Sequence, residues 1–270
     1  MMAEPAKLSG TKPRLYHALS SYYSMIARLA LVEGGIAYEP VVVDIHLKMV
    51  QQQPDYVRLN PNMTVPTLVL PDRILDQSRD IAEYALGVSA ATLDGETKAW
   101  LDLHYGYPIE ELTFGGLLAR NPLARIMIPR RLEAVCRRLL ERAAQNPDLA
   151  KVYEARAAVF AGRVRAFDPA AVVRLSAKRR AEAIGFMDRL EQTLHDGRAV
   201  LVPPAYGVAD VVWTVFLARM EFVGMGDEVR KRPALARYWH AMQARPSFAP
   251  ADIWTKLHVF RLIGGMLGLA

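Results

Sequence analysis

Residues 60–85 have the sequence NPNMTVPTLVLPDRILDQSRDIAEYA, and this stretch decides the fold. Two apolar runs within it are separated by Pro71-Asp72, a pair typical of tight turns, so they predict a β-hairpin. The segment that follows predicts a helix beginning at Gln77-Ser78. The stretch therefore predicts two neighbouring strands and then a helix.

The residues upstream extend this pattern. RLYHAL at 14–19 predicts a buried strand, and MIARLALVEGG at 25–35 predicts a helix that ends at its glycine pair. YEPVVVDI at 38–45 predicts a second strand, and the polar connection at 48–56 has room for a short helix. The predicted order is β-α-β-(short α)-β-β-α. The first two strands should be parallel, because a helix lies between them.

Strand signals nearly vanish after residue 92. Apolar-periodic segments predict helices instead, with breaks at Asn146-Pro147 and Asp168-Pro169. The helical segments are about 95–119, 130–162, 170–196, 208–223 and 233–244. The chain is therefore expected to form a small α/β domain at 13–88 and an all-helical domain at 95–262.

Composition excludes several classes of protein. Hydrophobic residues make up 52% and charged residues 23% of the 270, which is ordinary for a folded protein. One cysteine rules out an intramolecular disulfide, and no apolar run reaches the roughly 18 residues of a membrane-spanning helix. The N-terminus MMAEPAKLSGTKP lacks an apolar signal core. We therefore expect a cytoplasmic protein with no integral membrane association.

Positive charge is concentrated in one part of the chain. Residues 120–180 hold 15 Lys or Arg against 5 Asp or Glu. Such a face attracts anionic partners, although a solvated helical surface explains it equally simply. Aromatic residues do not alternate with the basic ones, so no nucleic-acid partner is expected. The six histidines show no paired ligand spacing, so no metal site is predicted.

Three short motifs point to an anion-binding site. SSYYS at 20–24 precedes the first helix, whose N-terminus favours a bound anion; the alternative for Ser21 is a role as the helix cap alone. Val65-Pro66 at the start of a strand is a candidate cis peptide. Gln77-Ser78 opens another helix and supplies a second such terminus. Together, in this order and spacing, the three motifs indicate a site more strongly than any one of them does alone.

Residues 13–88 resemble the thioredoxin-like N-terminal domain of the soluble glutathione transferases. SSYYSMIARLALVEGGIAYE, NPNMTVPTLV and DQSRDIAEYA carry the resemblance. YGVADVVWTVFLARM at 206–220 and RPALARYWHAMQARPSF at 232–248 resemble helices of the family's all-α C-terminal bundle. Residues near 140–175 look like an insertion. The resemblance implies the glutathione transferase fold, a homodimer, and glutathione as co-substrate with no metal.

The resemblance also implies roles for individual residues. Val65, before Pro66, would bind the cysteinyl backbone of glutathione, and Gln77 and Ser78 would bind its γ-glutamyl end. Ser21 falls where the serine and cysteine classes place the residue that faces the sulfur. A helix N-terminus and a hydroxyl donor lower the pKa of a thiol from about 8.5, so glutathione would react as the thiolate. Its target would be an apolar or aromatic electrophile.

Within the family, the chain most resembles bacterial tetrachlorohydroquinone reductive dehalogenases. Those enzymes have a cysteine two residues after the serine, where this chain has Tyr23. Tyr22 and Tyr23 are either donors to the thiolate or substrate, or packing residues. His104, Tyr105 and Tyr107 are expected on the first long helix of the second domain. They would line the electrophile site or serve in packing.

Two alternatives to simple transfer stay open. One is another glutathione-dependent reaction of aromatic degradation: isomerisation, thioether cleavage or reductive dehalogenation. Tyr23 in place of cysteine argues against the last of these by the mixed-disulfide route. The other is a non-catalytic protein of the same fold that binds apolar or anionic ligands, for which the basic segment at 120–180 is the motivation.

Overall fold

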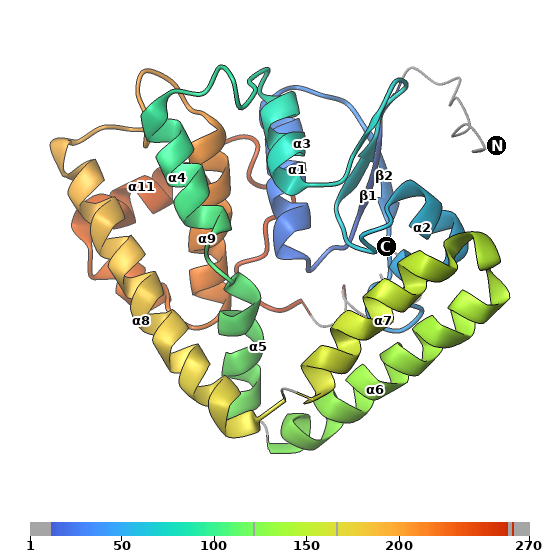
Figure 1. Cartoon of the computed structure of the whole chain (residues 1–270). Helices are drawn as coiled ribbons and strands as arrows, with labels where there is room; N and C mark the ends of the chain where they lie inside the picture. Colours follow the sequence, from blue (N-terminus) through green and yellow to red (C-terminus); the bar gives the residue numbers. More distant parts are fainter. Residues whose placement is uncertain (1–11, 121, 166, 259–260, 262–270) are drawn as a thin grey trace. The chain divides into compact units, whose positions relative to one another are not determined.

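The computed structural model describes residues 12–120, 122–165, 167–258 and 261 (Figure 1). Its sheet has the strand order β2-β1-β3-β4. β1 pairs with β2 in parallel, and β3 pairs antiparallel with both β1 and β4. The strands are β1 (Arg14–His17), β2 (Glu39–Val42), β3 (Thr67–Val69) and β4 (Ile74–Leu75). The predicted parallel pair and the hairpin are confirmed.

Helices make up most of the rest. Among the described residues after 92, no strand occurs. The helices are α1 (Tyr22–Glu33), α2 (Pro54–Leu59), α3 (Ser78–Ala85), α4 (Gly95–Tyr105), α5 (Ile109–Arg120), α6 (Pro122–Gln145), α7 (Ala150–Arg165), α8 (Pro169–Thr193), α9 (Val208–Phe222), α10 (Gly226–Arg230) and α11 (Pro233–Gln243), with short 3-10 turns η1 (Val50–Gln52), η2 (Pro147–Leu149) and η3 (Leu194–Asp196).

The helix expected over 95–119 is two helices, which corrects the prediction. α4 ends at Tyr105, and α5 begins at Ile109. Pro108 has no N–H to continue the ladder, and Gly106 serves as the C-cap of α4. Tyr107 therefore lies in the break and not on a helix. The breaks expected at Asn146-Pro147 and Asp168-Pro169 are confirmed.

α9 lies in the protein core and is buried along nearly its whole length. Trp213 and Phe216 are at most 1% exposed, and the Trp213 indole donates to the Trp100 carbonyl of α4 at 3.2 Å. Gly207 caps α9, and its N–H donates to Asp210 at 2.9 Å. A glycine N-cap costs only a few tenths of a kcal/mol against serine, so Gly207 is tolerated at the start of α9.

The chain forms two compact units. The first contains residues 1–51, 64–106 and 189–270, and so holds the sheet with α1, α3, α4 and α9–α11. The second contains residues 52–63 and 107–188, and so holds α2, α5, α6, α7 and most of α8. The domain limits expected from the sequence, 13–88 and 95–262, remain a prediction. The apolar C-terminal stretch from residue 259 lies almost wholly outside the described residues.

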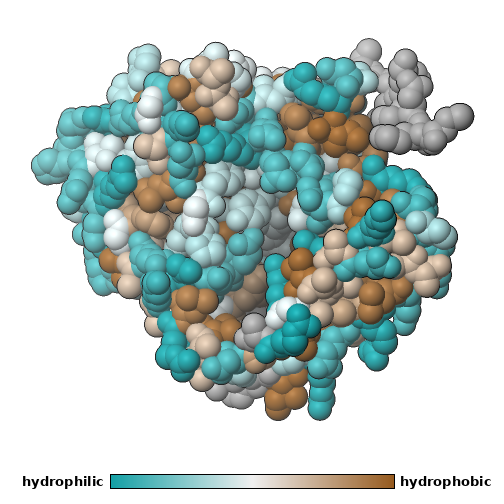
Figure 2. Space-filling model, viewed as in Figure 1, coloured by the Kyte–Doolittle hydropathy of each residue, from teal (hydrophilic) through white to brown (hydrophobic). Residues whose placement is uncertain are grey.

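A hairpin of two antiparallel helices, α6 and α7, dominates the second unit (Figure 1). Its turn packs on α2: Tyr153 is fully buried and its hydroxyl donates to the Gln52 carbonyl at 2.9 Å, while Arg58 pairs with Asp148 at 2.9 Å. Figure 2 shows apolar residues, in brown, on the surface of this hairpin, where Leu140 and Val159 are about half exposed. The insertion predicted near 140–175 falls largely within it.

Candidate active site

The turn between β1 and α1 is held by hydrogen bonds at both ends. The Ala18 amide donates to Ser24 Oγ at 3.2 Å, and the Ser21 amide donates to the Ala18 carbonyl at 3.2 Å. Ser21 caps α1, and its Oγ accepts the Ser24 N–H at 3.3 Å. The cap uses Oγ only as an acceptor, so the hydroxyl proton stays available to a ligand. The Ser21 side chain is half-buried, which leaves it reachable.

The N-terminus of α3 supplies a second set of donors. Its N-cap is Gln77, whose side chain makes no capping hydrogen bond among the described residues. The amides of a helix's first turn have no partners within the helix, and here the Gln77 side chain does not cap them. They therefore favour a bound carboxylate. Ser78 is buried, with its Oγ 3.2 Å from Tyr105 Oη on α4. Burial raises the pKa of Tyr105, which keeps that hydroxyl neutral beside Ser78.

Val65 lies two residues before β3. The peptide between Val65 and Pro66 is cis, as predicted. The backbone N–H and C=O of Val65 make no hydrogen bond within the described part of the chain. Unpaired backbone groups of this kind, at the end of a sheet strand, pair readily with an extended peptide.

Tyr22 and His104 form a buried pair. Tyr22 Oη lies 2.6 Å from His104 Nε2, and the two rings stack with centroids 5.7 Å apart. The hydroxyl of Tyr22 is thus held by α4, although Tyr22 stands next to Ser21 in the chain. Tyr23 is half-buried and meets the Tyr22 ring edge-on at 5.3 Å. Of the two tyrosines, Tyr23 is the more accessible.

Tyr107 belongs to the second unit, apart from the other predicted site residues. Its hydroxyl donates to the Arg179 carbonyl of α8 at 2.7 Å, and its ring meets Phe186 edge-on. These contacts give Tyr107 a packing role within its own unit. The first unit holds all the others: Ser21, Tyr22, Tyr23, Val65, Pro66, Gln77, Ser78, His104 and Tyr105.

His17 is the last residue of β1. His17 is buried, and its Nδ1 accepts a hydrogen bond from Arg28 at 3.1 Å. Burial, reinforced by the Arg28 charge, lowers the pKa of His17 to about 3. The ring is therefore a neutral core residue and not a donor at the surface of the site.

Sequence reasoning missed two residues that contact the turn before α1. His46 Nε2 lies 3.3 Å from Ser20 Oγ, and an Arg219 guanidinium nitrogen of α9 lies 3.4 Å from the Ser20 carbonyl. The sequence around His46 contains no feature that predicts its contact with Ser20. Arg219 does carry a signal, because it is a charged residue inside the apolar run that α9 buries.

Because His104 is buried, the stability of the fold should depend on pH. Burial lowers the pKa of His104 to about 3, from 6.5 when unburied. Between pH 6.5 and pH 3 the His104 imidazole is protonated in the unfolded chain but neutral in the folded chain. The contribution of the neutral ring to the free energy of unfolding is therefore complete above pH 6.5 and is lost as the pH falls towards 3. We expect up to about 1.4 kcal/mol lost per pH unit from this group. Urea unfolding at pH 6.5 and pH 5 measures this loss. Between the two pH values the free energy of unfolding should fall less for His104→Gln than for the wild type, and an equal fall would contradict the assignment.

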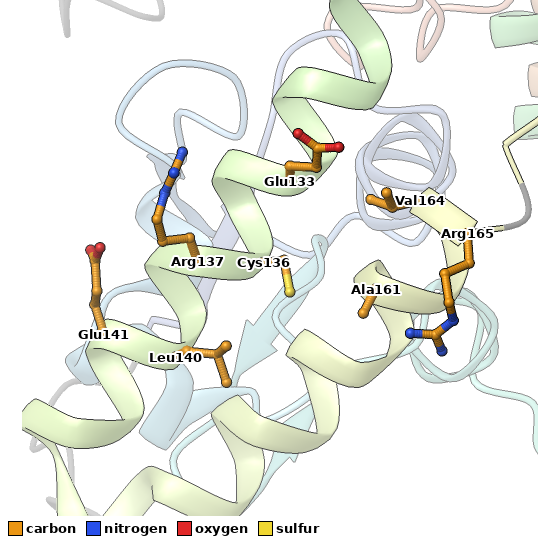
Figure 3. Close-up of a pocket in the computed structure, with 8 residues that line it drawn as sticks. All are labelled: Glu133, Cys136, Arg137, Leu140, Glu141, Ala161, Val164 and Arg165. Atoms are coloured by element: carbon orange, nitrogen blue, oxygen red, sulfur yellow. The ribbon is translucent and has the colours of Figure 1, made fainter.

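A groove of about 480 Å³ lies in the second unit, between α6 and α7 (Figure 3). Cys136, Leu140, Ala161 and Val164 line its apolar floor, and the Cys136 thiol lies 3.5 Å from the Ala157 carbonyl. None of the predicted site residues lines this groove. Cys136, the single cysteine of the chain, thus lies on α6 in the second unit, whereas the β1–α1 turn belongs to the first unit.

The described residues show neither a metal site nor a membrane span. No group of three or more His, Cys, Asp or Glu side chains among them is placed to hold a metal ion. None of the helices in the described ranges combines the length and apolar composition needed to cross a bilayer.

Comparison with known proteins identifies sequences similar to this chain. The family model for the glutathione S-transferase N-terminal domain matches residues 20–85. A tetrachloro-p-hydroquinone reductive dehalogenase of Sphingobium chlorophenolicum is 31% identical over 250 residues, covering 88% of this chain and 95% of that protein. A glutathione S-transferase of Arabidopsis thaliana is 27% identical, covering 87% of each chain.

Solved structures share the fold. A β-etherase from Sphingobium sp. strain SYK-6 superposes with a TM-score of 0.63 at 21% identity, covering 89% of this chain and 98% of that one. A glutathione transferase family member from Pseudomonas fluorescens Pf-5, solved with two glutathione bound, gives 0.62 at 18% identity, covering 90% and 93%. The expected fold class is confirmed. With its sheet, its helical region and these relatives, the chain belongs to the glutathione transferase family.

Proposed function

We propose that this protein binds glutathione on its first unit and activates the thiol as a thiolate at Ser21. The observation that carries the proposal is the half-buried Ser21 hydroxyl at the N-terminus of α1, which has a proton to donate. The α1 terminus adds a partial positive charge, and the two together favour a sulfur anion.

The same unit provides groups that suit the rest of the tripeptide. The unpaired backbone of Val65, which precedes Pro66, suits the cysteinyl backbone of glutathione. The first turn of α3, with Gln77 as its N-cap and Ser78 at its first position, suits the γ-glutamyl carboxylate. Relatives of the same fold have been solved with glutathione bound, which supports the assignment.

The reaction we propose is conjugation of glutathione, through its sulfur, to an apolar or aromatic electrophile. The thiolate attacks the electrophilic carbon, the new carbon–sulfur bond forms, and the leaving group departs with the bond's electron pair. His104 and Tyr105 are candidates for the substrate side of the site, with Tyr23 as an additional hydroxyl donor. We further propose that the protein works in the cytoplasm as a homodimer, as is implied by its family.

Glutathione binding tests the site directly. Calorimetric titration of the wild type at pH 7 should show binding, and Ser78→Ala should weaken it about tenfold, because a hydrogen bond to a charged group is worth about 1.5–3 kcal/mol. Ser89→Ala is the matched control: Ser89 is an exposed serine of the same unit and should bind like wild type. Absence of binding at millimolar glutathione would contradict the proposal.

Reductive dehalogenation is the second candidate, favoured by the 31% identity to the Sphingobium chlorophenolicum enzyme. This chain has Tyr23 where a cysteine would form the mixed disulfide, and its one cysteine is on α6. Stoichiometry separates the two reactions on a chlorinated hydroquinone. Transfer consumes one glutathione and releases chloride with a thioether product. Reduction replaces chlorine by hydrogen, consumes two glutathione molecules and yields glutathione disulfide.

A further inference from the structure

Arg219 is a nearly buried cation in the middle of the core helix α9. Only 4% of the residue is exposed. Its guanidinium lies over the Phe222 ring at 4.6 Å and over the Tyr22 ring at 5.4 Å, and one nitrogen donates to the Ser20 carbonyl at 3.4 Å. The side chain therefore reaches from α9 to the turn that presents Ser21.

A charge in this position is costly to the fold. A guanidinium keeps its proton in proteins, and removing it from water carries a penalty of several kcal/mol before its contacts compensate. Ring faces and a carbonyl dipole are among the contacts that offset this penalty. A hydrophobic residue of similar volume would pack in α9 without it. The charge lies against the carbonyl of Ser20, the residue that precedes Ser21, and this position suggests what the charge does.

We propose that Arg219 acts electrostatically on the glutathione site: its buried charge favours the thiolate form of glutathione bound beside Ser21. This inference rests on the proposed function and adds a residue to it. Ser21 and the α1 terminus act at short range, whereas Arg219 acts through the low-dielectric interior, where a charge is poorly screened. Arg219 is thus an electrostatic residue behind the donor, and Ser21 remains the group in contact with the sulfur.

Other ionisable groups face the same turn. Arg28 of α1 donates to the carbonyls of Ala18 and Leu19 at 3.3 and 3.2 Å, but its charge also faces Asp252 of the C-terminal segment. His46 contacts Ser20, and Tyr22 contacts His104, whose ring is neutral because burial lowers its pKa to about 3. Tyr23 lies beside Tyr22. Arg219 contacts both the Ser20 carbonyl and the Tyr22 ring.

The test follows the thiolate absorbance of bound glutathione as a function of pH. Arg219→Met removes the charge and keeps much of the volume, and Arg219→Gln also keeps a donor for the Ser20 carbonyl. We expect both to raise the pKa of the bound thiol by about one unit, a tenfold loss of thiolate at pH 7. Arg219→Lys, which keeps the charge, should retain most of the wild-type effect. If one neutral variant fails to fold, the other decides.

Two controls separate charge from structure. Arg189→Met removes an exposed guanidinium from the same unit, where it lies over Trp100, and should leave the thiol pKa unchanged. Binding of S-methylglutathione, which has no thiol to ionise, should change less than about twofold in the Arg219 variants.

The outcomes are distinct. A wild-type thiol pKa in the neutral variants, or a parallel loss of S-methylglutathione binding, overturns the inference while the proposed function stands. If wild-type protein neither binds glutathione nor lowers its thiol pKa, the proposed function itself fails.

Discussion

Ser21→Ala is expected to lower kcat/KM for an activated aryl chloride about a hundredfold. Removing one hydrogen-bond donor from a stabilised anion typically costs two to three orders of magnitude in rate. The Ser21 hydroxyl is the donor here, since its oxygen already accepts the Ser24 N–H and its proton has no acceptor within the described part of the chain. Steady-state kinetics at saturating glutathione, from pH 6 to pH 9, measures the loss, which should shrink as the solution itself ionises the thiol.

Helix capping must be separated from chemistry in this experiment. Ser21→Ala also removes the N-cap of α1, at a cost of about 1 kcal/mol of stability. Ser21→Thr keeps both the cap and the hydroxyl and should retain most of the activity. If Ser21→Ala stays active and Tyr23→Phe does not, the thiolate donor is Tyr23, and the role assigned to Ser21 is wrong.

Asp210→Ala is expected to lower the free energy of unfolding by about 3–5 kcal/mol. Asp210 is fully buried and accepts three hydrogen bonds: from the amides of Leu201 and Gly207 at 2.8 and 2.9 Å, and from the Tyr238 hydroxyl at 2.8 Å. Alanine would leave all three donors buried without an acceptor, each at about 1–3 kcal/mol before relaxation. Urea unfolding at pH 7 measures the difference.

Tyr238→Phe is the graded control for Asp210. It deletes one of the three donors and leaves the other two bonded, so we expect a loss of about 1 kcal/mol. Burial raises the pKa of the Asp210 carboxyl, while its three donors oppose that shift. A loss below about 1 kcal/mol for Asp210→Ala would show that this carboxylate does not organise the start of α9.

Local sequence signals predicted the first unit well. Apolar runs and turn residues predicted the hairpin at Pro71-Asp72 and the start of α3, and the helix between β1 and β2 predicted that these two strands are parallel. The predicted first helix began at residue 25, whereas α1 begins at Tyr22. The three helical residues at 22–24 belong to the polar run SSYYS, which does not look helical. Only the cap geometry of Ser21 shows where the helix begins.

What the sequence could not show depends on contacts between distant residues. Tyr22 and His104 are 82 residues apart, and the turn carrying Ser20 meets Arg219 across 199 residues. No local spacing encodes such pairs. The break between α4 and α5 was missed for a different reason: apolar periodicity continues across Gly106 and Pro108, and the missing N–H of Pro108 should have outweighed it.

The pKa of the thiol of glutathione bound to the wild-type protein tests the central claim most directly. It is measured from the thiolate absorbance during a pH titration at saturating protein, with free glutathione as the reference. The site described here predicts a bound value at least one unit below that of free glutathione, since a helix terminus, a hydroxyl donor and a buried cation all favour the anion. A bound thiol that ionises at the same pH as free glutathione would contradict it.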